Sequence, residues 1–343
     1  MPVSTQVRLA RRPEGEPGDD TYSFEEHELP ELVDGQLLLR VVYLSLDPYM
    51  RGRMSAAPSY AAPVEVGDIL VGGTVCVVEE SRHPEYSTGD MVLSYSGWQT
   101  HTISDGSQLR RLDPSVVPVS TALGVLGMPG FTAYAGLLEI GRPQAGETVV
   151  VAAATGPVGS AVGQIATVKG ARAVGIAGGE EKRQALLDEF GFDVALDHRS
   201  PTFADDLGAA VPDGIDVYFE NVSGPVAREV FKWMNLYGRV PVCGLVADYN
   251  AEAAPEGPDR LPGFMKRVLT KSLTVRGFIQ SEFTRSHGRD FVREMSAWVA
   301  DGSVRYREDV VDGLDAAPEA FRGLLTGRNF GNLLVRVSED PTR

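Results

Sequence analysis

The stretch VVVAAATGPVGS at residues 149–160 reads as a strand that runs into a glycine-rich turn. Its later residues have the spacing of the dinucleotide-binding loop G-x-G-x-x-G, with alanine in the first place: Ala154, Thr155, Gly156, Pro157, Val158 and Gly159. Alanine can serve there if the turn stays at negative φ. A side chain at Gly156 would collide with a pyrophosphate, and at Gly159 it would hold the following helix away from the strand. The alternative is an ordinary glycine-rich turn between a strand and a helix.

The flanking sequence favours the dinucleotide loop. Apolar residues after the turn fall on one helical face, which predicts a helix whose N-terminus suits an anion: Val158, Ala161, Val162, Ile165 and Ala166. From about residue 124 to 300, strand and helix patterns alternate, with candidate strands in ETVVVAAA, ARAVGIAGG, DVALDH, GIDVYFENV, GRVPVCGL and LTVRGFI. Such alternation predicts an α/β fold with a doubly wound, mostly parallel sheet of the Rossmann type.

The two ends of the chain have a different character. Up to about residue 120 the pattern is one of short β-rich runs, GQLLLRVVYLSL, GDILVGGTVCVVEE and GDMVLSYSGW, which predict a partly open barrel or sandwich. The tail returns to this pattern, with a short helix in DAAPEAFRGLL and a closing strand in GNLLVRVSED. We therefore expect a dinucleotide-binding domain at 124–301, set into a β-rich domain that both chain ends form, 1–123 and 302–343.

Composition excludes several classes of partner. The 343 residues carry a formal net charge of -15, which opposes binding to a nucleic-acid backbone. The N-terminus lacks the apolar core of a signal peptide, and no apolar run approaches the roughly 18 residues of a membrane span. We expect a soluble cytoplasmic protein that binds neither nucleic acid nor membrane.

Cysteine and histidine usage argues against metal. The chain has two cysteines, Cys76 and Cys243, so a disulfide framework is improbable and a four-cysteine zinc site is impossible. The five histidines show neither i, i+4 pairing nor a cysteine at ligand spacing. We expect no metal site, and hence no zinc-dependent alcohol dehydrogenase mechanism.

The residues after the second strand bear on which dinucleotide binds. A NAD site usually has Asp or Glu about 20 residues beyond the loop, to accept from the ribose 2′-hydroxyl. Here Ala177 and Gly178 stand at that position, which leaves room for a 2′-phosphate, and Lys182 can supply a positive charge. Arg183 is a weaker candidate, and the two glutamates before Lys182 would repel a phosphate unless they point away. The alternative for Lys182 is a solvated surface lysine.

Motifs along nearly the whole chain, in order and with similar spacing, carry a resemblance. They are LSLDPYMRGRM, GMPGFTAYAGLLEIG, AAATGPVGSAVGQIA, GGEEKRQALLDEFGFDVALDHR, DVYFENVSG, CGLVADYN and GRNFGNLLV. The chain resembles the zinc-free double-bond reductases of the medium-chain dehydrogenase/reductase superfamily, and within it the family of leukotriene B4 dehydrogenase, prostaglandin reductase and bacterial curcumin reductase.

The resemblance implies a GroES-like catalytic domain built from both chain ends, a Rossmann domain between them and a cleft where the two meet. It implies NADPH (NADP+) as the cofactor and a small α,β-unsaturated ketone or aldehyde as the substrate, whose carbon–carbon double bond is reduced. A homodimer is also expected, because dimers are common in the family.

Cofactor contacts also follow from the resemblance. Lys182 matches a lysine that contacts the adenosine 2′-phosphate, and His198 stands where many relatives have a phosphate-side tyrosine. A phosphate contact through His198 would vary with pH, and a surface histidine is the alternative. The remaining matches are two asparagines, the loop under the nicotinamide and a backbone segment near the carboxamide: Asn221, Asn329, Cys243, Gly244, Tyr249, Phe278, Ile279 and Gln280.

In the implied reaction, hydride adds to the β-carbon and negative charge moves to the carbonyl oxygen. Tyr249 matches the tyrosine usually assigned to polarising that carbonyl, and a phenol with an unperturbed pKa of about 10 is a protonated donor at neutral pH. Tyr49 is a second candidate that either lines the cleft or packs in the core. Two other functions stay open: a zinc-free NADPH quinone oxidoreductase, and a non-catalytic NADP(H)-binding protein.

Overall fold

The computed structural model describes residues 2–253 and 257–343, and the chain divides into two compact units. Unit 1 comprises Met1–Gly124 and Glu308–Arg343, and unit 2 comprises Val125–Arg307. The sequence places the return to the first unit at 302, whereas residues 302–307 stay with unit 2. The backbone N–H of Val304 donates to the carbonyl of Trp298, and that of Arg305 donates to Gln164 Oε1, which ties this segment to unit 2.

Unit 2 contains a six-stranded parallel sheet with the order β10-β9-β8-β11-β12-β13. In chain order this is 3-2-1-4-5-6, the order of the doubly wound dinucleotide-binding fold, and the strand order reverses between β8 and β11. The predicted α/β class and all six strands are confirmed: β8 (Thr148–Ala152), β9 (Arg172–Ala177), β10 (Val194–Asp197), β11 (Ile215–Phe219), β12 (Met234–Val242) and β13 (Thr274–Gly277).

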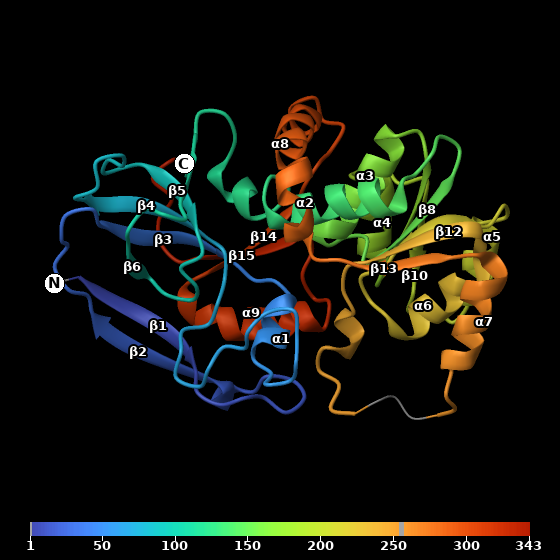
Figure 1. The fold of residues 1–343 in the computed structure, drawn as a ribbon, viewed down its shortest axis with the longest axis horizontal. Helices are drawn as coiled ribbons and strands as arrows, with labels where there is room; N and C mark the ends of the chain where they lie inside the picture. The colour runs from blue at the N-terminus through green and yellow to red at the C-terminus, as the bar shows by residue number, and fades with distance from the viewer. Residues whose placement is uncertain (1, 254–256) are drawn as a thin grey trace. The chain divides into compact units, whose positions relative to one another are not determined.

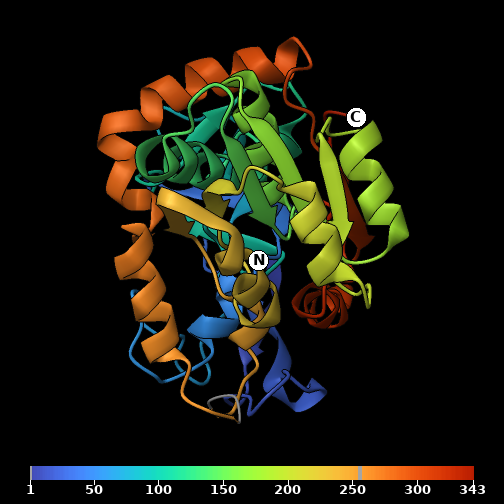
Figure 2. The same cartoon turned by 90° about the vertical axis from the view of Figure 1, so that its right-hand side faces the viewer.

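Helices cover both faces of this sheet, as the alternation of strands and helices requires. In Figure 1, α3 (Pro157–Val168) lies on the opposite side of the sheet from α6 (Gly224–Val230) and α7 (Leu261–Lys271). Side chains of alternate strand positions, with those of α5 (Phe203–Ala210) and α6, form a buried core on the α6 side: Val150, Ile176, Tyr218, Leu207 and Val230. Figure 2 shows α7 along the β12–β13 edge.

The remaining helices of unit 2 complete the other layer. They are α2 (Met128–Ala135), which continues into a π-helical turn at Gly136–Gly141, α4 (Glu180–Asp188) and α8 (Thr284–Ala300). Aromatic rings join α2 to α8, with the centroids of Phe131 and Phe291 5.2 Å apart. The hydroxyl of Tyr134 adds a hydrogen bond to Glu294 Oε2 at 3.0 Å. These contacts fix α8 against the helix that opens the unit.

Unit 1 is β-rich and is built from both chain ends. Its seven-stranded sheet has the order β14-β15-β3-β4-β5-β7, with β6 paired to β3, and β1 pairs with β2 in a separate hairpin. The predicted closing strand and the helix before it are confirmed, whereas the sequence did not predict β1, β2, β6, β7 or β14. The elements are β1 (Val3–Leu9), β2 (Tyr22–Glu28), β3 (Leu37–Ser45), α1 (Tyr49–Arg53), β4 (Thr74–Ser81), β5 (Met91–Ser94), β6 (His101–Ser104), β7 (Arg110–Leu112), β14 (Glu308–Asp312), α9 (Ala317–Leu325) and β15 (Asn332–Arg336).

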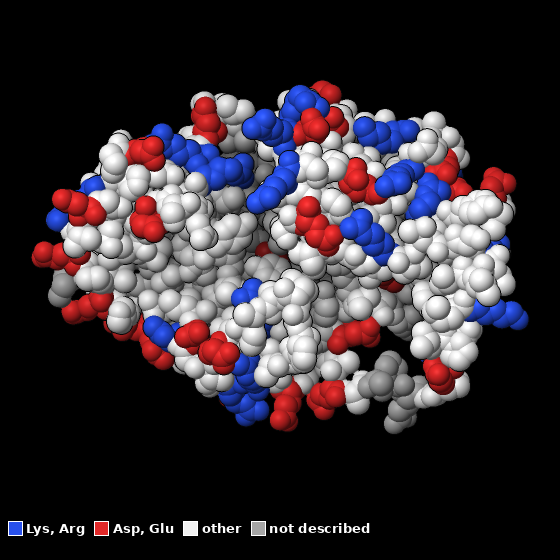
Figure 3. Space-filling model, in the orientation of Figure 1, with Lys and Arg blue, Asp and Glu red and all other residues white. Residues whose placement is uncertain are grey.

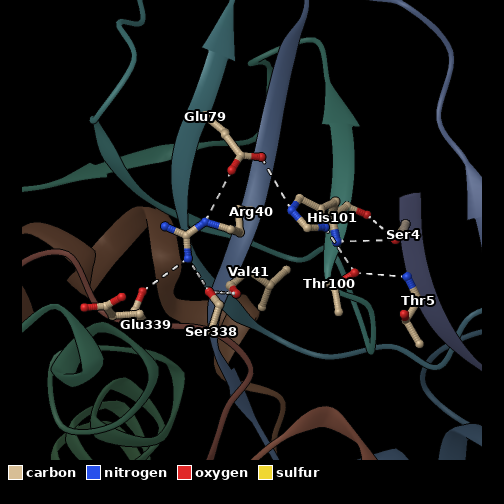
Figure 4. A network of polar contacts seen from close by, with 9 residues as sticks. All are labelled: Ser4, Thr5, Arg40, Val41, Glu79, Thr100, His101, Ser338 and Glu339. Carbon is tan, nitrogen blue, oxygen red and sulfur yellow. Dashed lines mark hydrogen bonds and ion pairs between the residues drawn. The ribbon is translucent and has the colours of Figure 1, made fainter. Parts of the chain in front are cut away.

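A network of hydrogen bonds and ion pairs connects the two chain ends to this sheet (Figure 4). Glu79 on β4 pairs with Arg40 Nε at 3.5 Å and with His101 Nε2 at 3.4 Å. Arg40 also donates to Ser338 Oγ, in the segment after β15. On the other side, Ser4 Oγ of β1 donates to the carbonyl of His101 at 2.7 Å. Unit 1 therefore holds its N-terminal hairpin and its C-terminal segment through one set of side chains.

Candidate dinucleotide and active site

The loop after β8 contains two glycines, Gly156 and Gly159, and the reason why each position needs a glycine differs. A Cβ on Gly159 would overlap the carbonyl oxygen of Ala153 and lie 2.8 Å from Ala154 Cα, so close packing of α3 on the loop requires this glycine. Gly156 has φ -73° and ψ 168°, which any residue can adopt, and its Cβ would meet only Ala153 O, at 3.4 Å. Neither conformation nor packing explains Gly156, whereas a pyrophosphate lying against the backbone would.

Alanine fits at 154, the first position of the loop, because the residue with left-handed backbone angles is the preceding one, Ala153. Ala153 has φ 50°, and Ala154 is not among the residues with positive φ. The N–H of Ala154 donates to the carbonyl of Ile176 on β9 at 2.9 Å, and its side chain is buried. The loop is thus anchored to the neighbouring strand.

The loop leads directly into α3, whose first helical bond runs from Ser160 N to the carbonyl of Gly156 at 2.9 Å. Within the described residues, no side chain caps this helix at Gly156. Residues 156–158 are partly exposed. The first turn of α3 therefore offers N–H groups and the positive end of the helix dipole to an anion.

Hydrogen bonds tie the loops after β8 and β11 together where the strand order reverses. Asn221 Nδ2 donates to the carbonyl of Ala152 at 2.8 Å. The buried carboxylate of Glu220 accepts from the N–H groups of Val222 at 2.6 Å and Ser223 at 2.9 Å. Burial raises the pKa of Glu220, and these two backbone bonds oppose the rise. The sequence did not single out Glu220, although a buried acid directly after a strand was the available signal.

The loop after β12 is hydrogen-bonded to the loop after β11. The N–H groups of Cys243 and Gly244 donate to the carbonyl of Glu220 at 2.9 and 3.2 Å, and that of Val246 donates to Asn221 O at 3.2 Å. The hydroxyl of Tyr249 lies 3.2 Å from the position that a Cβ on Gly244 would take. Burial raises the pKa of the Cys243 thiol to about 12, so the thiol is uncharged at neutral pH. The structure thus brings Asn221, Gly244 and Tyr249 together.

The segment after β13 meets this edge of the sheet through its backbone. The N–H of Phe278 donates to the carbonyl of Val242 at 3.3 Å. The Phe278 ring is buried against Phe219, and Gly136 lacks a side chain where the ring passes. Ile279 and Gln280 follow at the start of a short helical turn. The Phe278 side chain belongs to the core, which leaves the backbone as the part able to contact a ligand.

The ends of β9 and β10 carry basic side chains. Ala177 and Asp197 are register partners, and the N–H of His198 donates to the carbonyl of Ala177 at 3.0 Å. A Cβ on Gly178 would lie 2.9 Å from His198 Nε2 and 2.8 Å from Arg199 Nε. Loss of solvent around the ring and then the charge of Arg199 lower the pKa of His198. The sequence did not predict Arg199, although it is the second base of the DHR run.

The helix that carries Lys182 opens with an ion pair. Arg183 Nε donates to Glu180 Oε2 at 2.7 Å, so the charge of Arg183 is satisfied on the helix itself. The same pair turns Glu180 toward Arg183, which answers the repulsion that this glutamate would exert on a phosphate. The charge of Lys182 acts on His198 and lowers its pKa, so the two basic groups lie near each other.

Tyr49 and Asn329 belong to unit 1, unlike the other candidates. Tyr49 begins α1 and packs partly against the core that contains Leu46 and Met50. Burial, and then the charge of Asp47, raise the pKa of Tyr49. Asn329 Nδ2 donates to the carbonyl of Gly331 at 3.0 Å. Each side chain is thus positioned by its own unit.

Both cysteines are free. Among residues 2–253 and 257–343, no three His, Cys, Asp or Glu side chains form a group able to hold a metal ion. None of the helices in the described part of the chain has the length and apolar composition that crossing a membrane requires. Acidic and basic side chains are interspersed on the face drawn in Figure 3.

Comparison with known proteins relates this geometry to a family. Residues 5–112 match a family model described as the N-terminal domain of oxidoreductase, and residues 157–300 match one described as zinc-binding dehydrogenase. The NADPH-dependent curcumin reductase of Escherichia coli (strain K12) is 53% identical over 332 residues, which cover 97% of this chain and 96% of that protein. The chain belongs to the zinc-independent double-bond reductases of the medium-chain dehydrogenase/reductase superfamily.

Other members of these oxidoreductases are similar over the same length. Prostaglandin reductase 1 of Oryctolagus cuniculus is 41% identical over 322 residues, covering 92% of this chain and 88% of that protein. The crystal structure of CurA in complex with NADPH from Vibrio vulnificus has a TM-score of 0.95 and 49% identity, covering 98% of this chain and 100% of that one. A quinone oxidoreductase of Escherichia coli, at 17% identity and a TM-score of 0.73, shares the fold alone.

Proposed function

We propose that this chain uses NADPH to reduce the carbon–carbon double bond of α,β-unsaturated ketones and aldehydes. The observation that carries the cofactor assignment is Gly156, a glycine that only a close ligand explains, at the point where the order of a 3-2-1-4-5-6 sheet reverses. The curcumin and prostaglandin reductases, both named for double-bond-bearing substrates, support the type of reaction. Unit 1 is then the catalytic domain and unit 2 the cofactor domain.

The residues present fit the dinucleotide at each of its parts. Residues 154–159 would hold the pyrophosphate against the first turn of α3. Lys182 and His198 would hold the 2′-phosphate, and Asn221 with the loop from Cys243 to Tyr249 would face the nicotinamide end. Ile279, Gln280 and the backbone of Phe278 would meet the carboxamide, and Asn329 stays a predicted cofactor contact. Bound NADPH supplies a hydride.

The protein's own part in the reaction is to orient the alkene and stabilise the carbonyl oxygen as it gains negative charge. We assign this to the hydroxyl of Tyr249, which donates a hydrogen bond to that oxygen while hydride adds to the β-carbon. Gly244 leaves the hydroxyl room, and the bonds from residues 243–247 to Glu220, Asn221 and Val222 hold the loop that presents it. Tyr49 stays a second predicted catalytic residue.

A homodimer is the assembly we propose. β13 is the end strand of its sheet and its four residues are exposed, so its outer edge can pair with another strand. On α7 beside it, Leu261, Met265 and Leu269 are 61%, 53% and 78% exposed. A second copy of the chain would cover both features. Light scattering on a size-exclusion column tests this, and a monomer at micromolar concentration would contradict it.

The test of the reaction is the loss of NADPH absorbance with an aryl enone, compared with NADH as donor and with benzoquinone as acceptor. We expect a saturated ketone, identified by mass and NMR, and a strong preference for NADPH. An allylic alcohol would refute the assigned reaction. Turnover of the quinone alone would favour a quinone oxidoreductase, and binding of NADPH without turnover of any enone would favour a binding protein.

A further inference from the structure

The space beside Gly178 is filled by two basic side chains from the turn after β10, His198 and Arg199. We propose that Arg199 is a specificity-determining residue for the cofactor, and that its guanidinium binds the 2′-phosphate of NADPH beside His198. The inference rests on the proposed function and extends it to a residue to which the sequence analysis assigned no role. Three observations carry it: the reason for Gly178, the way Arg199 is held, and the balance of charges around it.

Position 178 needs a glycine because neighbouring side chains leave no room for a Cβ, and not because of its backbone angles. It is absent from the glycines with positive φ, so other residues could adopt its conformation. A Cβ there would lie 2.8 Å from Arg199 Nε, 3.1 Å from Arg199 Cζ and 2.9 Å from His198 Nε2. This is also where an NAD site would carry its ribose-binding acid. In this chain the acid is missing, and the side chains of an arginine and a histidine occupy its place.

The turn after β10 fixes the start of the Arg199 side chain. Asp197 Oδ1 accepts the backbone N–H of Arg199 at 2.9 Å. The carboxylate of Asp197 thus holds the backbone of the turn at Arg199. Arg199 and His198 are both exposed to solvent, so a ligand can reach them.

The charges around this point favour a phosphate. The groups that act on His198 are Arg199 and Lys182, which are positive, and Asp197, which is negative. Arg183 adds no open charge because Glu180 holds it. A guanidinium presents a planar fork of donors that matches phosphate oxygens, and charge-assisted bonds of this kind are the strong ones. We therefore expect Arg199 to contribute at least about a tenfold gain in affinity for the phosphate.

The experiment measures the dissociation constants of NADPH and NADH by calorimetry without any acceptor, for the wild type, Arg199→Ala, Arg199→Lys and the matched control Arg183→Ala. The readout is the ratio of the NADH constant to the NADPH constant, which isolates the 2′-phosphate. Arg199→Ala should lower this ratio about tenfold or more, with NADH binding unchanged within about twofold. Arg199→Lys should restore part of it, and Arg183→Ala should lower it far less than Arg199→Ala, because it removes a charge that Glu180 already neutralises and only frees that glutamate.

Failure of this inference can be told from failure of the proposed function. If the wild type prefers NADPH and Arg199→Ala keeps the same ratio, the role of Arg199 is wrong while the cofactor assignment stands. The role is equally wrong if Arg183→Ala lowers the ratio as much as Arg199→Ala. If the wild type binds NADH and NADPH equally, the cofactor assignment itself fails. Gly178→Asp gives an independent check, because an acid added beside the two bases should repel the 2′-phosphate and shift the preference toward NADH.

Discussion

The two glycines of the loop after β8 make opposite predictions for the same substitution. In Gly156→Ala the new Cβ meets only Ala153 O at 3.4 Å, an ordinary contact, and the backbone angles suit alanine. We expect the free energy of unfolding to change by less than about 0.5 kcal/mol. In Gly159→Ala the Cβ overlaps Ala153 O and lies 2.8 Å from Ala154 Cα, and both are backbone atoms that cannot rotate away. Overpacking of this kind costs about 1–3 kcal/mol.

The two variants should also separate in cofactor affinity. If the pyrophosphate lies against Gly156, the methyl group of the alanine in Gly156→Ala occupies the space that the pyrophosphate needs. We then expect NADPH to bind about 10–100-fold more weakly. Melting followed by circular dichroism gives stability, with about 2–4 °C expected per kcal/mol for a unit of this size. Titration calorimetry gives the dissociation constant.

The reasoning is refuted by either of two results. Gly156→Ala could melt as early as Gly159→Ala, which would mean that the protein itself needs glycine at 156. Alternatively, Gly156→Ala could bind NADPH within about threefold of the wild type. That result would remove the structural argument for a pyrophosphate at this place.

Four further predictions concern single side chains. Tyr249→Phe should lower kcat for an enone about 10–100-fold without changing the NADPH dissociation constant; an unchanged kcat in steady-state assays would exclude the carbonyl-polarising role. Burial raises the pKa of Asp47 to about 6 from 3.8, so the native state binds the proton more tightly than the unfolded chain does. The free energy of unfolding should therefore fall by roughly 2–3 kcal/mol as pH rises between these two pKa values. Denaturant unfolding of Asp47→Asn should lack this loss, and equal pH slopes in both proteins would contradict it. Ala153→Gly should raise the melting temperature by the equivalent of up to about 1 kcal/mol, because φ is 50° at Ala153; a lower melting temperature would show that the methyl group contributes packing. His198→Gln should reduce the gain in NADPH affinity as pH falls below neutral, because loss of solvent and the charge of Arg199 lower the pKa of the free ring and a phosphate favours the protonated ring. Identical pH profiles would exclude that contact.

Much of unit 2 could be predicted from sequence because its central strands are buried on both faces. β8 and β9 read as continuous apolar runs, and the helices between strands have a clear apolar side. The elements that were not predicted lack such patterns. β2 exposes six of its seven residues at least partly, among them the charged run Glu25–Glu28, and every residue of β14 is at least partly exposed. Pairing with a neighbouring strand, which a local pattern does not encode, creates both.

The candidate site divides in the same way. Residues 154–159 and Lys182 follow from spacing along one chain segment, because the loop chemistry is local. The contacts of Arg199 and Glu220 arise from strand register and from backbone hydrogen bonds between loops. Gly244 is informative only once the Tyr249 hydroxyl is known to lie over it. Such roles depend on the direction of side chains across strands, which no single motif contains.

The most direct test of the proposed reaction is the fate of the hydride. NADPH with deuterium at the transferred position of the nicotinamide is used to reduce an aryl enone in ordinary water, and the product is analysed by mass and NMR. We predict a saturated ketone with deuterium on the β-carbon and an unlabelled proton on the α-carbon. Deuterium on the carbinol carbon of an allylic alcohol would contradict the account.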